Sequence, residues 1–147
     1  MVKQYIYVIA VFLFVISCAN YAADTNHFRH LAKVVIQKNA SWSDYVSSDE
    51  TPEMCKDFVL TEADVKQFFT LARVASEQEY SHDLLMSRCT ASGKVTMVNK
   101  KEGEWKIDRA RRGLLVLTDG TRYFFYCGKC KSKVYSEACD IDCIHGE

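Results

Sequence analysis

Hydrophobic residues in the first half of the chain recur every three or four positions, which is typical of a helix that buries one face. This spacing predicts a short helix within 24–39 and a longer helix over 61–80. Thr61 is a suitable N-cap for the longer helix, and Asp64 supplies the acidic third residue of a capping box. Residues 40–54, which are rich in Ser, Asp and Glu, predict a loop between the helices.

Apolar and polar residues alternate in the second half, which is typical of strands with one buried face. The alternation predicts four strands, at 94–98, 104–108, 114–118 and 121–126, and it allows a short strand at 55–60. Asp119-Gly120 between the last two strands predicts a two-residue hairpin turn of type I′. Such a turn would place Val116 opposite Tyr123.

These elements predict an α+β fold, with one or two helices packed on a small antiparallel β-meander. The length of 147 residues suits one domain, which we expect to span 24–147 and to end in a Cys-rich tail. The composition, 48% apolar and 26% charged, is that of a globular protein. One face of the sheet should pack on the 61–80 helix. The other face should be covered by the first helix or the tail, or serve as a binding surface.

Residues 1–23 have the features of a secretory signal. Lys3 precedes an unbroken apolar run from Tyr5 to Ile16. That run has the length of a signal-peptide core and is shorter than the ~20 residues that span a bilayer. The sequence therefore predicts export from the cytoplasm.

Small residues after the apolar run allow two kinds of processing. Ordinary cleavage would follow Ala22 or Ala23, where the residue three before the cut does not fit an A-x-A site. Alternatively, Val15-Ile16-Ser17-Cys18 resembles the lipobox of small bacterial envelope lipoproteins. This resemblance, which covers four residues, implies that Cys18 is lipidated and becomes the N-terminus. It also implies a periplasmic protein anchored to the outer membrane, because the residue after the cysteine is Ala19 and not Asp. Ordinary cleavage would instead give a secreted protein.

Six cysteines remain without Cys18, an even number that can pair fully in an oxidising compartment. They are Cys55, Cys89, Cys127, Cys130, Cys139 and Cys143. We expect Cys55 and Cys89, which flank the 61–80 helix, to form a disulfide. The last four form C-x-x-C and C-x-x-x-C motifs, which are compatible with two disulfides, a four-thiolate zinc site or a catalytic dithiol.

Export favours disulfides in these motifs, so we expect neither a metal nor a cofactor. Cys127–Cys143 with Cys130–Cys139 is one easy pairing, and a bond within C-x-x-C is another. No serine lies in a G-x-S-x-G context, and no Gly-rich phosphate loop is present. His27 and His30 have no third metal ligand nearby, and the acidic residues around His82 resemble a charged helix end. We therefore expect a non-enzymatic protein.

Charge is unevenly distributed in a chain whose formal net charge is zero. Residues 91–135 contain 11 basic and 4 acidic residues, whereas acidic residues predominate on both sides of this region. A basic patch of this kind can steer an acidic partner, and the alternative is an evenly solvated strand face neutralised by the acidic segments.

We expect this basic region to bind a periplasmic or envelope protein with an acidic surface. The expected contact residues are Lys100, Lys101, Arg109, Arg111, Arg112, Arg122, Tyr123 and Phe124. An inhibitor or an immunity factor is the sharper form of this expectation. A zinc- or thiol-dependent protein that uses the last four cysteines is the alternative. Nucleic acid is not an expected ligand of a protein attached to the membrane by lipid.

Overall fold

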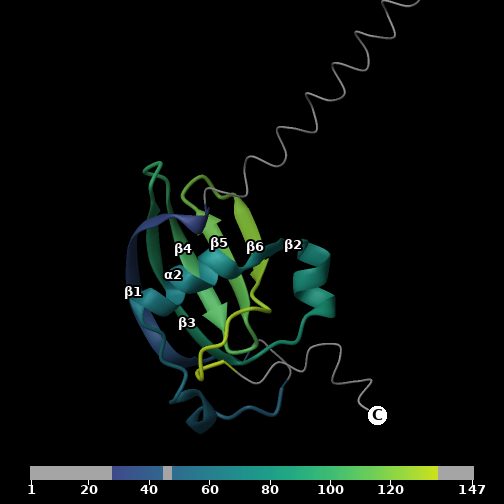
Figure 1. Ribbon diagram of the computed structural model, residues 1–147. Coiled ribbons are helices and arrows are strands. Elements are labelled where there is room, and N and C mark those ends of the chain that lie inside the picture. Colours follow the sequence, from purple (N-terminus) through teal and green to yellow (C-terminus); the bar gives the residue numbers. More distant parts are fainter. Residues whose placement is uncertain (1–27, 45–47, 136–147) are drawn as a thin grey trace, which may run out of the picture.

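The computed structural model describes residues 28–44 and 48–135, which form one antiparallel six-stranded sheet and the helix α2 (Glu62–Leu71) (Figure 1). The strands are β1 (Leu31–Trp42), β2 (Arg73–Ala75), β3 (Cys89–Met97), β4 (Glu102–Asp108), β5 (Arg112–Leu117) and β6 (Arg122–Tyr126). Their order in the sheet is β1-β3-β4-β5-β6-β2. Two short helical turns, η2 (Glu53–Cys55) and η3 (Glu79–Asp83), lie in the connections. The predicted α+β class is confirmed.

The predicted meander is confirmed by β3 to β6, whose three connecting turns have the same form. In each turn a backbone N–H bonds to the carbonyl three residues earlier, and its residue has a positive φ. These residues are Lys100 (φ 64°), Arg111 (φ 68°) and Gly120 (φ 86°). The three hairpins are therefore closed by three-residue loops, in which the last residue is left-handed.

The type I′ prediction for the last hairpin is wrong for this reason. The Gly120 N–H donates to the Leu117 carbonyl at 2.9 Å, so the loop also includes Thr118. The extra loop residue shifts the pairing by one position and places Val116 opposite Arg122. The prediction of a hairpin is confirmed, but the predicted register is wrong by one residue.

The prediction of a helix within 24–39 is also wrong where the structure describes it. Residues 31–42 form β1, which pairs with β3 from Leu31 opposite Met97 to Trp42 opposite Cys89. The run Val34-Val35-Ile36 is β-branched and favours a strand, although its spacing also fits a helix. Hydrogen bonding to β3, which is distant in the sequence, favours the strand over the helix.

The helix α2 begins as predicted. The Asp64 N–H donates to Thr61 Oγ1 at 3.2 Å, and the Thr61 N–H donates to Asp64 Oδ2 at 2.8 Å, which completes the capping box. The helix ends at Leu71 rather than near Tyr80, because Ala72 is extended and the next residues pair with β6 as β2. The segment 55–60 is not a strand, but it runs beside β1: the Ala40 N–H donates to the Phe58 carbonyl at 3.0 Å.

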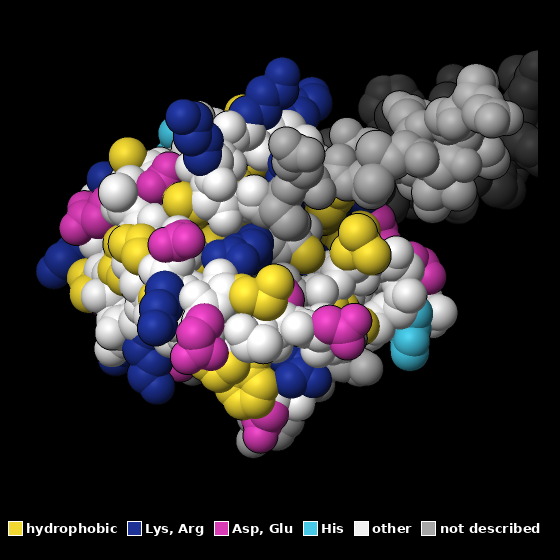
Figure 2. All heavy atoms as spheres, turned by 90° about the horizontal axis from the view of Figure 1, so that it is seen from below, with side chains coloured by type: hydrophobic (Ala, Val, Ile, Leu, Met, Phe, Trp, Pro, Cys, Tyr) yellow, Lys and Arg dark blue, Asp and Glu magenta, His cyan; other side chains and the backbone are white. Residues whose placement is uncertain are grey.

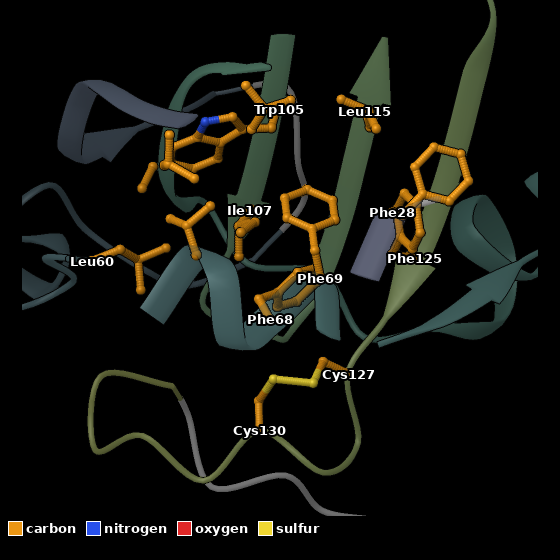
Figure 3. Close-up of a cluster of buried hydrophobic side chains, with 14 of the residues drawn as sticks. Phe28, Leu60, Phe68, Phe69, Trp105, Ile107, Leu115, Phe125, Cys127 and Cys130 are labelled. Carbon is orange, nitrogen blue, oxygen red and sulfur yellow. A yellow bond between two sulfur atoms is a disulfide. The ribbon is translucent and has the colours of Figure 1, made fainter. Parts of the chain in front are cut away.

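The core lies between α2 and one face of the sheet (Figure 3). Phe68 and Phe69 of the helix are almost fully buried, and the Phe69 ring lies 5.3 Å from that of Phe125 in β6. Gly113 makes this approach possible, because a Cβ at that position would lie 2.5 Å from a carbon of the Phe68 ring. The prediction that one face of the sheet packs on this helix is confirmed.

Two disulfides connect buried cysteines. Cys55 in η2 is bonded to Cys89 at the start of β3, as predicted. Cys127 is bonded to Cys130, so the bond lies within C-x-x-C and the pairing of Cys127 with Cys143 is wrong. Cys139, Cys143 and Cys18 lie outside the described residues, as does the predicted signal segment 1–23.

The sheet face that points away from α2 is covered only at one corner within the described residues. There Tyr80 of η3 lies with its ring 4.9 Å from that of Phe124. Elsewhere this face carries charged side chains in alternate positions of β4, such as Glu104 and Lys106. Within the described ranges, no helix combines the length and the apolar character needed to cross a bilayer.

Candidate functional site

The exposed or half-buried basic residues of the expected contact surface are divided between two opposite ends of the sheet, which Figure 1 shows. We call the end with the β3–β4 and β5–β6 turns the hairpin end; it carries Lys100, Lys101 and Arg122. The opposite end, which we call the disulfide end, has the β4–β5 turn with Arg109 and Arg111. The length of β4 separates the two ends by roughly 20 Å, at about 3.3 Å per residue. The eight residues therefore do not form a single surface.

Arg112 is not a surface residue. It is 5% exposed, and its Nε donates to Asp108 Oδ2 at 2.8 Å. Its Nη1 donates to the Tyr80 carbonyl at 2.8 Å, and its guanidinium lies 4.6 Å from the centre of the Tyr80 ring. Burial raises the pKa of Asp108 to about 6, although the guanidinium acts in the opposite direction. Arg112 therefore fastens η3 to the sheet and is not available to a partner.

Tyr123 and Phe124 point to opposite faces of β6, and other rings already contact both of them. The Tyr123 ring lies 4.4 Å from that of Phe28, and the Phe124 ring lies 4.9 Å from that of Tyr80. Both residues are half-buried. They hold neighbouring segments on the sheet and do not combine with the basic turns.

Both disulfides lie at the disulfide end, and backbone hydrogen bonds join them to the β4–β5 turn. The Arg109 N–H donates to the Cys89 carbonyl at 2.9 Å, and the Cys127 N–H donates to the Arg111 carbonyl at 3.0 Å. Arg111 Nη1 also donates to the Gly128 carbonyl at 3.5 Å. Figure 3 shows the segment that contains Cys127 and Cys130 continuing past the end of β6, beside the helix. The turn and this segment thus form one fixed unit.

This unit carries a set of basic residues that we call the basic patch. Its members are the half-buried Arg109 and Arg111 and the exposed Lys129, Lys131 and Lys133. Figure 2 views this end of the molecule and shows basic side chains spread over it, with acidic and hydrophobic side chains between them. The acidic residue of the turn, Asp108, is paired with Arg112, while the exposed Glu53 and Asp57 flank Cys55, which its disulfide to Cys89 joins to this end.

Reasoning from the sequence missed the three lysines of the basic patch. They occupy alternate positions in and after the C-x-x-C motif, and that alternation was the available signal.

The arrangement of Cys127 and Cys130 limits their chemistry. Their sulfur atoms are bonded to each other, and the two residues are at most 1% exposed. Neither sulfur is a thiolate that could bind zinc or attack a substrate. Among the described residues, no group of three or more His, Cys, Asp and Glu side chains is placed to hold a metal ion.

Three hollows in the described part of the surface are small and open. Two of about 250 Å³ each lie beside Glu104 on the uncovered sheet face, and one of about 190 Å³ lies between Phe69 and Arg73. The Arg73 guanidinium is paired with the Glu79 carboxylate, and the pairing lowers the pKa of Glu79. His82, close to this pair in sequence, is exposed.

Comparison with protein-family models, with curated proteins and with solved structures finds no match to this chain. The features of the described residues that bear most on function are the two basic ends of the sheet. Of these, the disulfide end is the one whose backbone is fixed by covalent bonds.

Proposed function

We propose that this protein is a non-enzymatic envelope protein that binds an acidic surface of another protein through the basic patch. The observation that carries the proposal is the combination of five basic residues with a backbone fixed by two disulfides and by hydrogen bonds. A surface that is already ordered loses little conformational entropy on binding, so more of the contact energy appears as affinity. Basic side chains also speed the encounter with an acidic partner.

An inhibitor or an immunity factor is the form of this function that best suits such a surface. Either would act by covering an acidic region of its partner, without chemistry of its own. Arg109 and Arg111 at the base of the patch would supply paired hydrogen bonds to carboxylates, and the exposed lysines would supply less directional charge.

The proposed location is the periplasm, with Cys18 carrying the lipid that attaches the chain to the outer membrane. The lipobox-like sequence supports the lipid attachment, and the two disulfides support an oxidising compartment. Mass spectrometry of the mature protein tests both statements. We expect a chain that begins at a diacylated Cys18; a chain that keeps Met1, or free thiols at Cys55 and Cys89, would reject export.

Photo-crosslinking in living cells tests the partner and the surface together. A photoreactive phenylalanine analogue in place of Ser132, between two lysines of the patch, should give an adduct with one protein. The same analogue in place of Val98, at the hairpin end, should not give this protein adduct.

Charge reversal provides matched controls for this experiment. Lys129→Glu, Lys131→Glu and Lys133→Glu in combination should remove the adduct at position 132. Lys100→Glu, Lys101→Glu and Arg122→Glu change the net charge equally and should leave it. Loss of the adduct in both variants, or in neither, would contradict a contact through the basic patch.

A further inference from the structure

We infer that the hairpin end is a docking surface for anionic lipid, and that it rests on the membrane to which Cys18 attaches the chain. This inference depends on the lipid attachment proposed above. It gives a separate role to Lys100, Lys101 and Arg122, which the fold places far from the basic patch.

The first described residues lie at the hairpin end (Figure 1). The Val98 N–H in the β3–β4 turn donates to the His30 carbonyl at 3.3 Å, and Leu31 is paired with Met97. The Phe28 ring packs on Tyr123 in β6. The chain therefore leaves the domain beside the two hairpin turns.

Under the proposed attachment, the hairpin end lies within a short distance of the lipid. Cys18 and Phe28 are ten residues apart in the sequence, and a fully extended chain covers at most about 36 Å over that distance. The disulfide end lies a further strand length from the point of attachment. Of the two ends, the hairpin end is thus the one that can meet the membrane surface most readily.

The charges at the hairpin end suit an anionic surface. Its segments 28–33, 97–102 and 118–122 contain the exposed basic residues Arg29, Lys33, Lys100, Lys101 and Arg122. Against these five stand two acidic residues, Glu102 and Asp119. Basic residues next to a membrane are attracted by anionic headgroups, and the attraction falls off within about 8–10 Å at physiological salt.

An exposed apolar side chain lies among these charges. Val98 in the β3–β4 turn is 68% exposed, the largest exposed fraction among the large hydrophobic residues of the described ranges. An exposed apolar residue beside lysines gains free energy when it enters the boundary between headgroups and acyl chains. The turn therefore offers both attractions that bring a protein surface onto an anionic bilayer.

The test uses the mature lipidated protein, reconstituted in vesicles of phosphatidylcholine with or without phosphatidylglycerol. A photoreactive phenylalanine analogue in place of Val98 should form adducts with lipid, and their yield should be roughly tenfold higher in the vesicles that contain phosphatidylglycerol. The analogue in place of Ser132 should form few lipid adducts in either vesicle.

The same two triple charge-reversal variants are the controls for lipid crosslinking, and their expected effects are the reverse of those for protein crosslinking. Lys100→Glu, Lys101→Glu and Arg122→Glu should remove the preference for phosphatidylglycerol, while Lys129→Glu, Lys131→Glu and Lys133→Glu should preserve it. Equal yields in the two vesicles, or equal loss in both variants, would overturn the inference. A lipidated chain that gives equal yields contradicts only this inference, whereas an unlipidated Cys18 contradicts the proposed attachment.

Discussion

At the scale of single residues, the buried pair of Asp108 and Arg112 makes stability depend on pH. Burial raises the pKa of Asp108 to about 6, above the value of about 3.9 for an unfolded chain. At a pH between these two pKa values, Asp108 is protonated more fully in the folded protein than in the unfolded chain. Lowering the pH from 7 to 5 should therefore add about 1 kcal/mol to the free energy of unfolding through this carboxyl group.

Urea unfolding at pH 7 and pH 5 measures this effect. The reference is a variant that combines Asp108→Asn with Arg112→Met, because it removes both charges together and leaves neither buried without its partner. The wild type should gain stability relative to this variant as the pH falls. An equal pH dependence in the two proteins would contradict the raised pKa of Asp108.

At the scale of elements, the hairpin turns contain backbone strain that substitution can relieve. Lys100 has a φ of 64°, a conformation in which a residue with a Cβ is disfavoured. Lys100→Gly should raise the free energy of unfolding by roughly 0.5–1 kcal/mol. Lys101→Gly is the control, since the φ of Lys101 is not positive, and it should lower the free energy of unfolding. Denaturant midpoints of the two variants distinguish these outcomes.

Local signals predicted the elements that depend on local structure. The capping box fixed the start of α2, and alternation located the four strands of the meander. The strand β1 was missed because its residues fit either period, and its hydrogen-bond partners in β3 lie 47 or more positions away in the sequence. The end of α2 was missed for a similar reason, since Arg73–Ala75 gains its hydrogen bonds from β6.

The candidate surface depended on contacts that the sequence does not reveal. Arg109, Arg111 and Arg112 lie within one short stretch, yet the last is buried on Asp108 while the others remain partly exposed. The lysines at 100 and 101 are close to this turn in the sequence and a strand length away in the fold. Charge composition therefore pointed to the basic region as a whole but could not divide it into two ends.

At the scale of the whole molecule, the two disulfides should contribute unequally to stability. The Cys55–Cys89 bond closes a loop with a sequence separation of 34, and the Cys127–Cys130 bond closes one of 3. If disulfides act by lowering the entropy of the unfolded chain, closing these loops stabilises the folded protein by about 4 and about 2 kcal/mol, respectively. All four cysteines are at most 1% exposed, so replacing either pair by alanine removes similar packing.

Unfolding of the two double variants tests this difference. Cys55→Ala with Cys89→Ala should have the lower urea midpoint, and Cys127→Ala with Cys130→Ala should retain more of the native stability. The opposite order would mean that the short C-x-x-C bond stabilises the native packing of the 127–135 segment more than it restricts the unfolded chain.

The position of β1 determines how the domain would respond to mechanical force. Under the proposed anchoring, a pull on the tether acts along β1 from its first residue, while the load of a bound partner acts at the far end of the sheet. Eight residue pairs join β1 to β3, and their hydrogen bonds run across the direction of tension. Shear of this kind loads the bonds together instead of peeling them apart one by one, so the strand nearest the tether is also well placed to transmit tension into the sheet.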